Sequence, residues 1–319
     1  MRDRYDRKIE YLRISVTDLC NLRCRYCMPQ GGIVDKKTHS DMLTLEEIFQ
    51  AVKACASLGI KKVRITGGEP LIRKGISSLI RNISEIESIS DIAMTTNGIL
   101  LKKYAKELKD AGLKRVNISL DTMNEEKYSY ITRFGTLQDV LDGIEISRKL
   151  GLLPLKINTV LIGGFNDNEI GDFVNLTIKE DIQVRFIELM PIGQASHWAR
   201  ENFLSNKEVL RRFKDLVPIK KEDKSSPAEY YKLPGAKGTV GLINPVSHQF
   251  CSNCNRIRLT ADGKIKPCLL SDKEIDVKEA LKKGEDLEKI IRFAILEKPQ
   301  QHYLQSGKST KRDMIRIGG

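Results

Sequence analysis

Three cysteines close together near the start of the chain constrain it more than any other feature. Cys20, Cys24 and Cys27 are spaced Cys-x3-Cys-x2-Cys and follow an apolar, strand-like run over residues 11–16. Three thiolates form a soft ligand set that suits zinc or an iron–sulfur cluster. A structural zinc site is closed by four protein ligands, whereas three leave one coordination position open for a group that reacts. Because no other Cys or His lies between Cys27 and His39, the loop predicts a metal centre with an open position.

The other cysteines support a metal rather than disulfides. The chain has seven, an odd number, and six of them fall into two tight groups. The alternative for the first group is three buried or reactive thiols without a metal, but buried cysteines have no reason to gather in a polar loop. No apolar run approaches ~18 residues and no signal-peptide pattern is present, so we expect a cytoplasmic protein without a membrane span. In that compartment, grouped cysteines indicate metal binding.

The second group leaves two interpretations open. Cys251 and Cys254 are followed by Cys268, and a turn at residues 261–263 would fold the chain back to bring it beside the first pair. His248 could complete a Cys3His zinc site, so zinc and a second three-cysteine cluster are both possible from this stretch. Arg256 and Arg258 would share one strand face, where their guanidiniums could bind phosphates or form a solvated strand edge.

A β-α rhythm runs through the first two thirds of the chain. Apolar, β-branched runs predict six strands, at residues 11–17, 62–66, 91–95, 115–120, 155–162 and 184–189. Amphipathic stretches predict helices between them, at residues 44–58, 101–111, 137–150 and 168–179, three of which stop at a glycine. Six such units predict a parallel sheet with right-handed crossovers. Because six units do not close as eight do, we expect an α/β fold that is an open, partial (β/α)6 TIM-like barrel.

After Gly193 the rhythm breaks, which predicts a second region. The pattern predicts a short helix at residues 206–213 and a polar linker at 220–227, followed by antiparallel strands at 229–233 and 239–243. We therefore divide the chain into a core barrel, residues 1–225, and a C-terminal α+β extension, residues 226–319, that carries the second cysteine group. The boundary falls somewhere between residues 219 and 235.

Basic residues recur on strands that are otherwise apolar. The chain carries 54 basic and 42 acidic residues, a net charge of +12 that fits nucleic acid, a membrane surface or a phosphorylated substrate. Lys62, Arg64 and Thr66 alternate along one strand and so share a face, and inward cations would be costly without an anion. Similar cations occur on the first, fifth and sixth strands, which favours a phosphate ligand over a merely polar barrel mouth. These residues are Arg13, Lys156 and Arg185.

Polar residues follow each predicted strand, at the end where parallel α/β folds bind ligands. Together with the cysteine groups they carry a resemblance to a known family. The motifs are Thr17-Asp18-Leu19-Cys20-Asn21-Leu22-Arg23-Cys24, Arg64-Ile65-Thr66-Gly67-Gly68-Glu69-Pro70-Leu71, Phe250-Cys251-x2-Cys254-Asn255-Arg256-Ile257-Arg258, and the terminal Ile317-Gly318-Gly319. The chain resembles the radical S-adenosylmethionine superfamily and, more narrowly, the GTP 3′,8-cyclases of molybdenum cofactor biosynthesis.

The resemblance implies a radical cyclisation with two 4Fe–4S clusters. The first cluster would bind the amino and carboxylate groups of S-adenosylmethionine at its open iron, and cleavage would give a 5′-deoxyadenosyl radical. In the family that radical takes hydrogen from C3′ of GTP, and the ribose radical then attacks C8 of guanine. The product is (8S)-3′,8-cyclo-7,8-dihydroguanosine 5′-triphosphate. The second cluster would hold guanine, which replaces the zinc interpretation.

The resemblance also assigns roles to residues, by match of position. Cluster ligands are Cys20, Cys24, Cys27, Cys251, Cys254 and Cys268. Contacts to S-adenosylmethionine are implied for Tyr26, Gly68, Ser119 and Met190. The GTP site would be formed by Arg13, Lys62, Arg64, Thr95, Lys156, Arg185, Arg256 and Arg258. Catalytic roles are implied for Arg13, Gly318 and Gly319.

Partners follow from the same resemblance. We expect an electron donor, delivery of the product to the cyclic pyranopterin monophosphate synthase, no nucleic acid or membrane partner, and a monomer or homodimer. Two alternatives remain at the level of sequence. One is another two-cluster radical S-adenosylmethionine enzyme, such as a peptide-modifying maturase, and the other is a zinc-bearing nucleic-acid-binding protein. The second leaves the Gly-Gly-Glu-Pro strand end unexplained.

Overall fold

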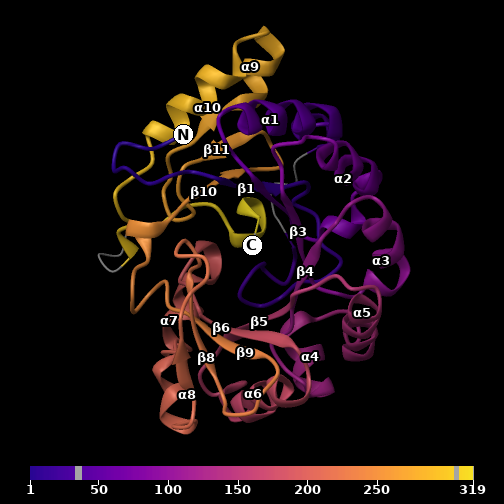
Figure 1. The fold of residues 1–319 in the computed structure, drawn as a ribbon, viewed down its shortest axis with the longest axis vertical. Coiled ribbons are helices and arrows are strands. Elements are labelled where there is room, and N and C mark those ends of the chain that lie inside the picture. The colour runs from indigo at the N-terminus through magenta and orange to yellow at the C-terminus, as the bar shows by residue number, and fades with distance from the viewer. Residues whose placement is uncertain (33–37, 305–308, 319) are drawn as a thin grey trace.

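One open sheet organises the chain. The structure is a computed structural model, and it describes residues 1–32, 38–304 and 309–318. Within these ranges twelve strands form a single sheet (Figure 1). From edge to edge they are β12 (Ile275–Asp276), β11 (Lys264–Lys266), β10 (Arg256–Leu259), β1 (Tyr11–Ser15), β2 (Lys62–Thr66), β3 (Asp91–Thr96), β4 (Arg115–Ser119), β5 (Leu155–Leu161), β6 (Ile182–Glu188), β9 (Thr239–Ile243), β8 (Ala228–Lys232) and β7 (Val217–Ile219).

The predicted α/β partial barrel is confirmed, but its parallel part is wider than expected. Strands β1 to β6 pair in sequence order, all parallel. Two strands from the C-terminal region extend this run, since β10 pairs with β1 and β9 pairs with β6, again in parallel. Only β7, β8, β11 and β12 are antiparallel to their neighbours in the described sheet. The C-terminal strands thus cover both exposed edges of the six-stranded barrel, which would otherwise offer unpaired backbone groups.

Helices cover the outer face of the barrel, as Figure 1 shows for α1, α2, α3 and α5. Helix α1 starts with a capping box, because the Thr44 hydroxyl accepts from the Glu47 N–H at 3.1 Å and the Glu47 carboxylate accepts from the Thr44 N–H at 2.8 Å. The described α-helices are α1 (Leu45–Ser57), α2 (Ile76–Ser84), α3 (Leu101–Asp110), α4 (Glu125–Thr132), α5 (Leu137–Lys149), α6 (Ile170–Lys179), α7 (Ser196–Glu201), α8 (Lys207–Arg212), α9 (Val277–Lys283) and α10 (Leu287–Leu296). None of them is long and apolar enough to cross a membrane.

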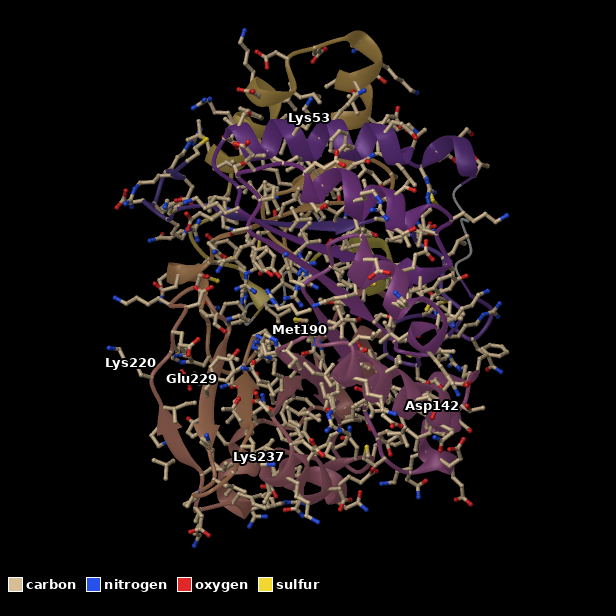
Figure 2. All side chains as sticks on the ribbon, turned by 45° about the vertical axis from the view of Figure 1, so that its right-hand side comes forward. Lys53, Asp142, Met190, Lys220, Glu229 and Lys237 are labelled. Carbon is tan, nitrogen blue, oxygen red and sulfur yellow. The ribbon has the colours of Figure 1, made fainter. Side chains whose placement is uncertain are left out.

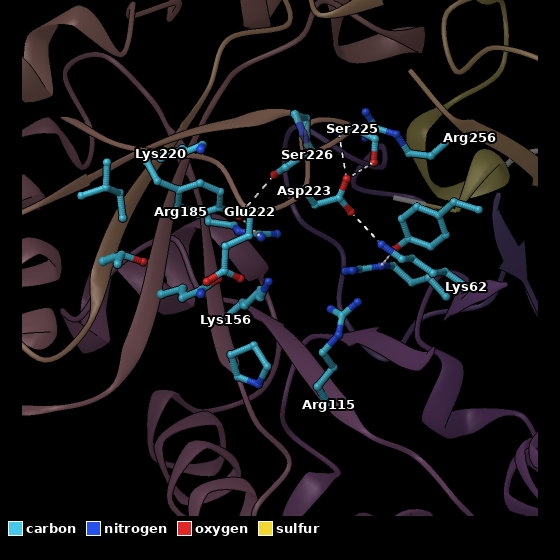
Figure 3. Close-up of a pocket in the computed structure, with 18 residues that line it drawn as sticks. Lys62, Arg115, Lys156, Arg185, Lys220, Glu222, Asp223, Ser225, Ser226 and Arg256 are labelled. Atoms are coloured by element: carbon cyan, nitrogen blue, oxygen red, sulfur yellow. Dashed lines mark hydrogen bonds and ion pairs between the residues drawn. The ribbon is translucent and has the colours of Figure 1, made fainter. Parts of the chain in front are cut away.

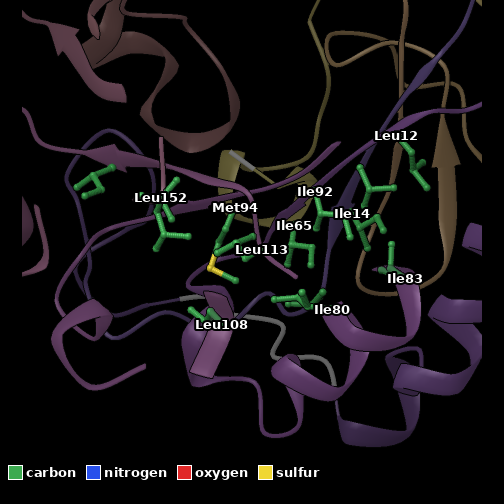
Figure 4. Packing of buried hydrophobic residues seen from close by; sticks show 14 of the residues in the cluster. Leu12, Ile14, Ile65, Ile80, Ile83, Ile92, Met94, Leu108, Leu113 and Leu152 are labelled. Atoms are coloured by element: carbon green, nitrogen blue, oxygen red, sulfur yellow. The ribbon is translucent and has the colours of Figure 1, made fainter. Parts of the chain in front are cut away.

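Strand alternation decides which side chains enter the core and which face the inside of the barrel. Ile65 of β2 and Ile14 of β1 are fully buried and pack toward helix α2, whose Ile80 and Ile83 lie opposite (Figure 4). Burying one such side chain contributes about 1.5–3 kcal/mol. Because neighbouring residues on a strand point to opposite faces, Arg64 then faces the concave interior. The apolar core and the cationic interior are two faces of the same strands.

The C-terminal tail ends inside the concave face. A short 3-10 helix, η7 (Met314–Ile317), brings the end of the chain to the middle of the barrel (Figure 1). Figure 2 places Met190, just past β6, toward the middle of the molecule, whereas the exposed side chains of Lys220 and Lys237 lie toward its periphery. The tail and the strand ends therefore meet over one interior surface.

Candidate active site

A cavity of about 270 Å³ lies inside the barrel (Figure 3). It is open toward the first residues of several parallel strands, including Tyr11 of β1 and Lys62 of β2, and residues 219–227 run across it. The sequence predicted a site at the carboxyl ends of the strands, but this cavity lies toward their amino ends. The reason is that its polar groups come from strand faces inside an incomplete barrel, and not from the loops alone.

Cations dominate the lining of this cavity. Five of the predicted phosphate-binding residues line it, from four different strands: Lys62, Arg64, Lys156, Arg185 and Arg256. Arg115 and Lys220 add to them, while Glu222 and Asp223 are the carboxylates in the lining. Burial and the nearby Arg185 and Arg115 lower the pKa of Lys156 to about 6. Cations that suppress one another's charge indicate a site that an anion would stabilise.

Three predicted GTP-site residues lie beside the cavity rather than in its lining. The Thr95 hydroxyl accepts from Arg64 Nη1 at 3.2 Å, so Thr95 holds a guanidinium that does face the cavity. Arg258 and Arg13 turn toward the C-terminal tail instead. Nη1 of Arg258 donates to the carbonyls of Ile317 and Gly318 at 3.2 and 3.1 Å, and Nη2 of Arg13 lies 3.4 Å from the carbonyl of Gly318.

The geometry at Gly318 admits only glycine. Its φ of +73° is left-handed, and a Cβ would lie 2.4 Å from the Thr66 hydroxyl. Farther back, the Arg312 guanidinium donates to both carboxylate oxygens of Asp262 at 3.0 Å and to Glu274 at 2.6 Å, which fixes the tail to the β10–β11 hairpin. Gly319, also predicted to be catalytic, lies outside the described residues.

Sequence reasoning missed several residues of the cavity. Arg115 alternates with Asn117 on β4 in the same pattern as the predicted cations, so the signal was present; its Nε donates to Asp91 at 3.1 Å. The hydroxyls of Tyr11 and Tyr230 each accept a hydrogen bond from a cavity arginine, Arg64 and Arg185 respectively. Aromatic residues on apolar strands carry no comparable signal.

Residues 219–227, which lie across the cavity, supply a carboxylate that competes with an anionic ligand for one of the cations. The Asp223 carboxylate accepts from Lys62 Nζ at 2.7 Å and from the Ser225 hydroxyl at 2.6 Å (Figure 3). Burial alone would raise the pKa of Asp223, but these two partners lower it to about 2. Lys62, one of the five predicted cations, is therefore paired with Asp223. This carboxylate belongs to residues 220–227, which the sequence predicted only as a linker.

The first cysteine group lies in the loop that follows β1. The N–H of Cys27 donates to the carbonyl of Cys24 at 2.9 Å, and the N–H of Leu22 points at the sulfur of Cys20 at 3.3 Å. Burial raises the pKa of Cys20 to about 11 and that of Cys27 to about 12, and the negative charges of Cys20 and Asp313 add to the rise at Cys27. Three buried thiols in one loop suit a cluster of several metal ions, because each thiolate can then bind a different ion and the metal replaces its proton.

The Gly-Gly-Glu-Pro strand end locks this loop in place. A Cβ at Gly68 would come within 2.1 Å of the Leu19 carbonyl and 3.1 Å of Cys20 Cβ, so only glycine allows the strand end to approach the cysteine loop. The buried Glu69 carboxylate accepts from the N–H groups of Leu71 at 3.0 Å and Asn97 at 2.8 Å. Two strand ends and the cysteine loop therefore form one rigid support.

Of the other predicted cofactor contacts, Tyr26 is the most firmly placed. Its hydroxyl donates to Asp121, just past β4, at 2.7 Å. Ser119 is the last residue of β4, and Met190 packs against the tail cluster that contains Ile317. Ser119 and Met190 lie at the carboxyl ends of their strands, and Tyr26 of the cysteine loop reaches Asp121 beside one of these ends.

Two buried cations hold the second cysteine group, and neither was predicted. Arg7, backed by Asp3 at 2.7 Å, donates to the carbonyl of Cys251 at 2.9 Å. Nζ of Lys298, which is only 3% exposed, donates to the carbonyls of Arg256 at 2.8 Å and Pro267 at 2.7 Å. Burial opposes ionisation of Cys254, but Lys298 and Arg256 lower its pKa to about 6.

The donor set of this second group is again three thiols, Cys251, Cys254 and Cys268, all partly exposed and not joined in disulfides. Among the described residues no three or more His, Cys, Asp or Glu side chains are close enough to hold a single metal ion. His248, considered as a fourth zinc ligand, is thus not drawn into such a set. Three cysteines beside buried cations suit an anionic cluster.

Comparison with known proteins gives close relatives over the whole chain. A family profile described as "Radical SAM superfamily" matches residues 14–177, and one described as "Molybdenum Cofactor Synthesis C" matches residues 182–304. A GTP 3′,8-cyclase from Peptoclostridium acidaminophilum is 58% identical over 318 residues, covering 99% of this chain and 98% of that protein. Another, from Alkaliphilus oremlandii, is 58% identical over 322 residues and covers 100% of both. A third, from Thermodesulfovibrio yellowstonii, is 49% identical over 326 residues, with 100% of both covered.

Solved structures give the same architecture at much lower identity. Streptococcus suis SuiB bound to precursor peptide SuiA aligns with a TM-score of 0.62 and 15% identity, covering 97% of this chain and 76% of that one. SuiB bound to S-adenosylmethionine aligns with a TM-score of 0.60, also at 15% identity, covering 97% of this chain and 77% of that one. At this identity the likeness shows the fold alone.

Proposed function

The chain belongs to the GTP 3′,8-cyclase family of the radical S-adenosylmethionine superfamily, and we propose that it cyclises GTP with the triphosphate held in the cationic cavity. The reaction is the first step of molybdenum cofactor biosynthesis. The observation that carries the proposal for the site is the cavity itself, where cations from five strands of the parallel run, β10, β2, β4, β5 and β6, meet with few carboxylates. A zinc-bearing nucleic-acid-binding protein does not fit a chain of this family.

The first cysteine group is proposed to bind a 4Fe–4S cluster and S-adenosylmethionine. When bound, this pair supplies a carbon radical that abstracts hydrogen from the substrate. The chain's own part is to orient it: Gly68 lets the strand end approach the loop, and Tyr26 is fixed by Asp121. Ser119 and Met190 complete the proposed contacts from two further strand ends.

The substrate's phosphates are proposed to lie among the strand cations. A triphosphate carries about four negative charges, and the planar fork of arginine matches its oxygens. Arg64 and Arg185 are each oriented by a tyrosine hydroxyl, so their free N–H groups are already aimed before the ligand arrives. Binding of the triphosphate also displaces the Asp223 carboxylate from Lys62. Thr95 takes part by holding Arg64.

The second cysteine group is proposed to carry another 4Fe–4S cluster that holds the guanine. Arg256 links the two ends of the site, because it lines the cavity and lies two residues after Cys254. Among the residues that the structure describes, its buried Nε and Nη2 have no hydrogen-bond partner, which suits a ligand that supplies one. The nucleotide would then span from the cavity to the second group.

The tail is proposed to complete the reacting end of the site. Arg13 of β1 and Arg258 of β10 hold the carbonyl of Gly318, and Gly318 lies against Thr66 of β2. Gly319 lies outside the described residues, and its role is proposed from the family resemblance alone. In this role Arg13 and the two glycines position the substrate and exclude water.

The domain division, location, assembly and partners of the chain are also proposals. We assign residues 1–225 to the core and 226–319 to the second-cluster region, with a cytoplasmic location and a monomer or homodimer as the assembly. An electron donor would reduce the first cluster, and the product would pass to the cyclic pyranopterin monophosphate synthase. The chain would bind neither nucleic acid nor membranes.

Anaerobic reconstitution tests the proposed cofactors. Purified protein should bind about eight irons per chain, which corresponds to two 4Fe–4S clusters. Replacing Cys24 by Ala should leave about four irons and abolish formation of 5′-deoxyadenosine, whereas replacing Cys254 by Ala should leave cleavage of S-adenosylmethionine possible but stop GTP cyclisation. Zinc without iron in the unmodified protein would refute the assignment.

A further inference from the structure

A cluster of arginines and exposed aromatic rings lies on the outer side of the first cysteine loop. We call it the arginine–aromatic patch: Arg23, Arg25, Tyr130, Arg133 and Phe134. The two rings are unusually open for their size, with Phe134 51% and Tyr130 49% exposed. Exposed aromatic side chains next to arginine are typical of protein interfaces.

The arginines of the patch are held by rings and backbone. The guanidinium of Arg25 stacks 3.8 Å from the Tyr130 ring centre and its Nε donates to the Tyr130 carbonyl at 2.9 Å. Arg23 lies 5.4 Å from the Phe134 ring centre. Nη1 of Arg133 donates to the carbonyls of Arg23 and Met28 at 2.8 and 3.1 Å. Within the described residues no carboxylate forms an ion pair with any of these three arginines, so their charge is available to a partner.

The patch is part of the loop that carries the first cysteine group. Arg23 and Arg25 flank Cys24 in sequence, and their N–H groups donate at 3.0 Å to the carbonyls of Thr132 and Ile131 at the end of α4. The loop and the end of this helix therefore form one surface. Whatever binds the patch contacts the backbone that holds the cysteines.

We propose that the arginine–aromatic patch is the docking surface for a small acidic electron-carrier protein of the flavodoxin or ferredoxin class. The inference rests on the proposed function of the first cysteine group, which requires an electron from outside. On docking, the carrier is oxidised by one electron and the cluster bound by Cys20, Cys24 and Cys27 is reduced by one. Three unpaired cations match the acidic surface of such a carrier, and the two rings supply the apolar centre of the contact.

Single-stranded nucleic acid is the other polymer that arginines and open rings could bind. The position of the patch favours the carrier, because its arginines alternate with the cysteine ligands themselves. The alternative becomes an outcome of the test.

The test separates docking from chemistry by comparing two reductants. In the variant Arg23→Glu/Arg25→Glu, formation of 5′-deoxyadenosine driven by dithionite should stay within about twofold of the unmodified protein. With reduced flavodoxin as the donor, kcat/KM for the donor should fall by about tenfold or more in the variant. Added salt should lower this kcat/KM less in the variant than in the unmodified protein. Phe134→Ser should weaken flavodoxin binding, measured by fluorescence anisotropy, without changing net charge.

A matched control changes the same charge elsewhere. Arg148→Glu/Lys149→Glu at the exposed end of α5 alters net charge equally and should leave both reductants unaffected. Equal losses with dithionite and flavodoxin would show that the arginines serve the cysteine loop and not docking, and unchanged flavodoxin kinetics would also overturn the proposal. The proposal would also be overturned if the Arg23→Glu/Arg25→Glu variant lost binding to single-stranded DNA while its binding to flavodoxin stayed unchanged. Failure of the unmodified protein to react even with dithionite would instead count against the proposed function, and flavodoxin anisotropy would still decide the docking surface.

Discussion

Lys156 gives the sharpest quantitative prediction for the cavity. Its ammonium is buried among arginines, and burial with Arg185 and Arg115 lowers its pKa to about 6. At pH 7.5 only about 3% of such a group is protonated. A bound triphosphate favours the charged form and raises the pKa again, so GTP binding should take up about 0.9 proton per chain. Affinity for GTP should accordingly fall by up to about tenfold per pH unit between pH 6.5 and 8.

Calorimetry measures this uptake directly. GTP is titrated into reduced, reconstituted protein at pH 7.5 in two buffers with different ionisation enthalpies, and the difference in heat gives the protons exchanged. Lys156→Met should remove the uptake, while Lys220→Met, an exposed lysine at the rim of the same cavity, should keep it. The phosphate groups of GTP titrate equally in all three proteins. Equal uptake by the unmodified protein and Lys156→Met would refute the reasoning.

Three further predictions concern the supports of the site. Lys298→Met should lower the free energy of unfolding by about 3 kcal/mol, because two carbonyls lose a charged donor, and Lys298→Arg should restore part of it; an unchanged denaturant midpoint would contradict the role of this buried cation. Gly318→Ala should leave the melting temperature nearly unchanged but reduce turnover by at least about tenfold, since its Cβ would displace the tail; full turnover would show that the tail does not contribute. Asp223→Asn should tighten GTP binding by about threefold by releasing Lys62, and weaker binding in a fluorescent-nucleotide assay would indicate that Asp223 contacts the ligand itself.

The sequence alone was enough for the elements with local signals. Strands β1 to β6 and their order followed from β-branched runs and glycine stops, and the capping box of α1 is readable at Thr44 and Glu47. The pairing of β9 and β10 at the two edges of the parallel run was not predicted. Those strands pair with partners about 55 and 245 residues away in the chain, and no local pattern encodes that choice.

The residues of the site also fall into those that the sequence predicts and those that it does not. Cations on apolar strands could be predicted, because alternation gives them one face, and five of them line the cavity. Arg7 and Lys298 could not, since each reaches the second cysteine group from a distant segment through backbone carbonyls, which leave no trace in the sequence. The ion pair between Asp223 and Lys62 depends likewise on how residues 219–227 cross the barrel. Contacts made by long side chains to distant backbone are the part that only the structure reveals.

In the proposed reaction the chain holds GTP with C3′ within reach of the radical centre at the first cysteine group. Incubating the reduced, anaerobic protein with S-adenosylmethionine and GTP deuterated at C3′ tests it most directly. We expect one deuterium in each 5′-deoxyadenosine, formed together with the cyclised nucleotide and detected by mass spectrometry. Unlabelled 5′-deoxyadenosine, or label without a cyclised product, would contradict it.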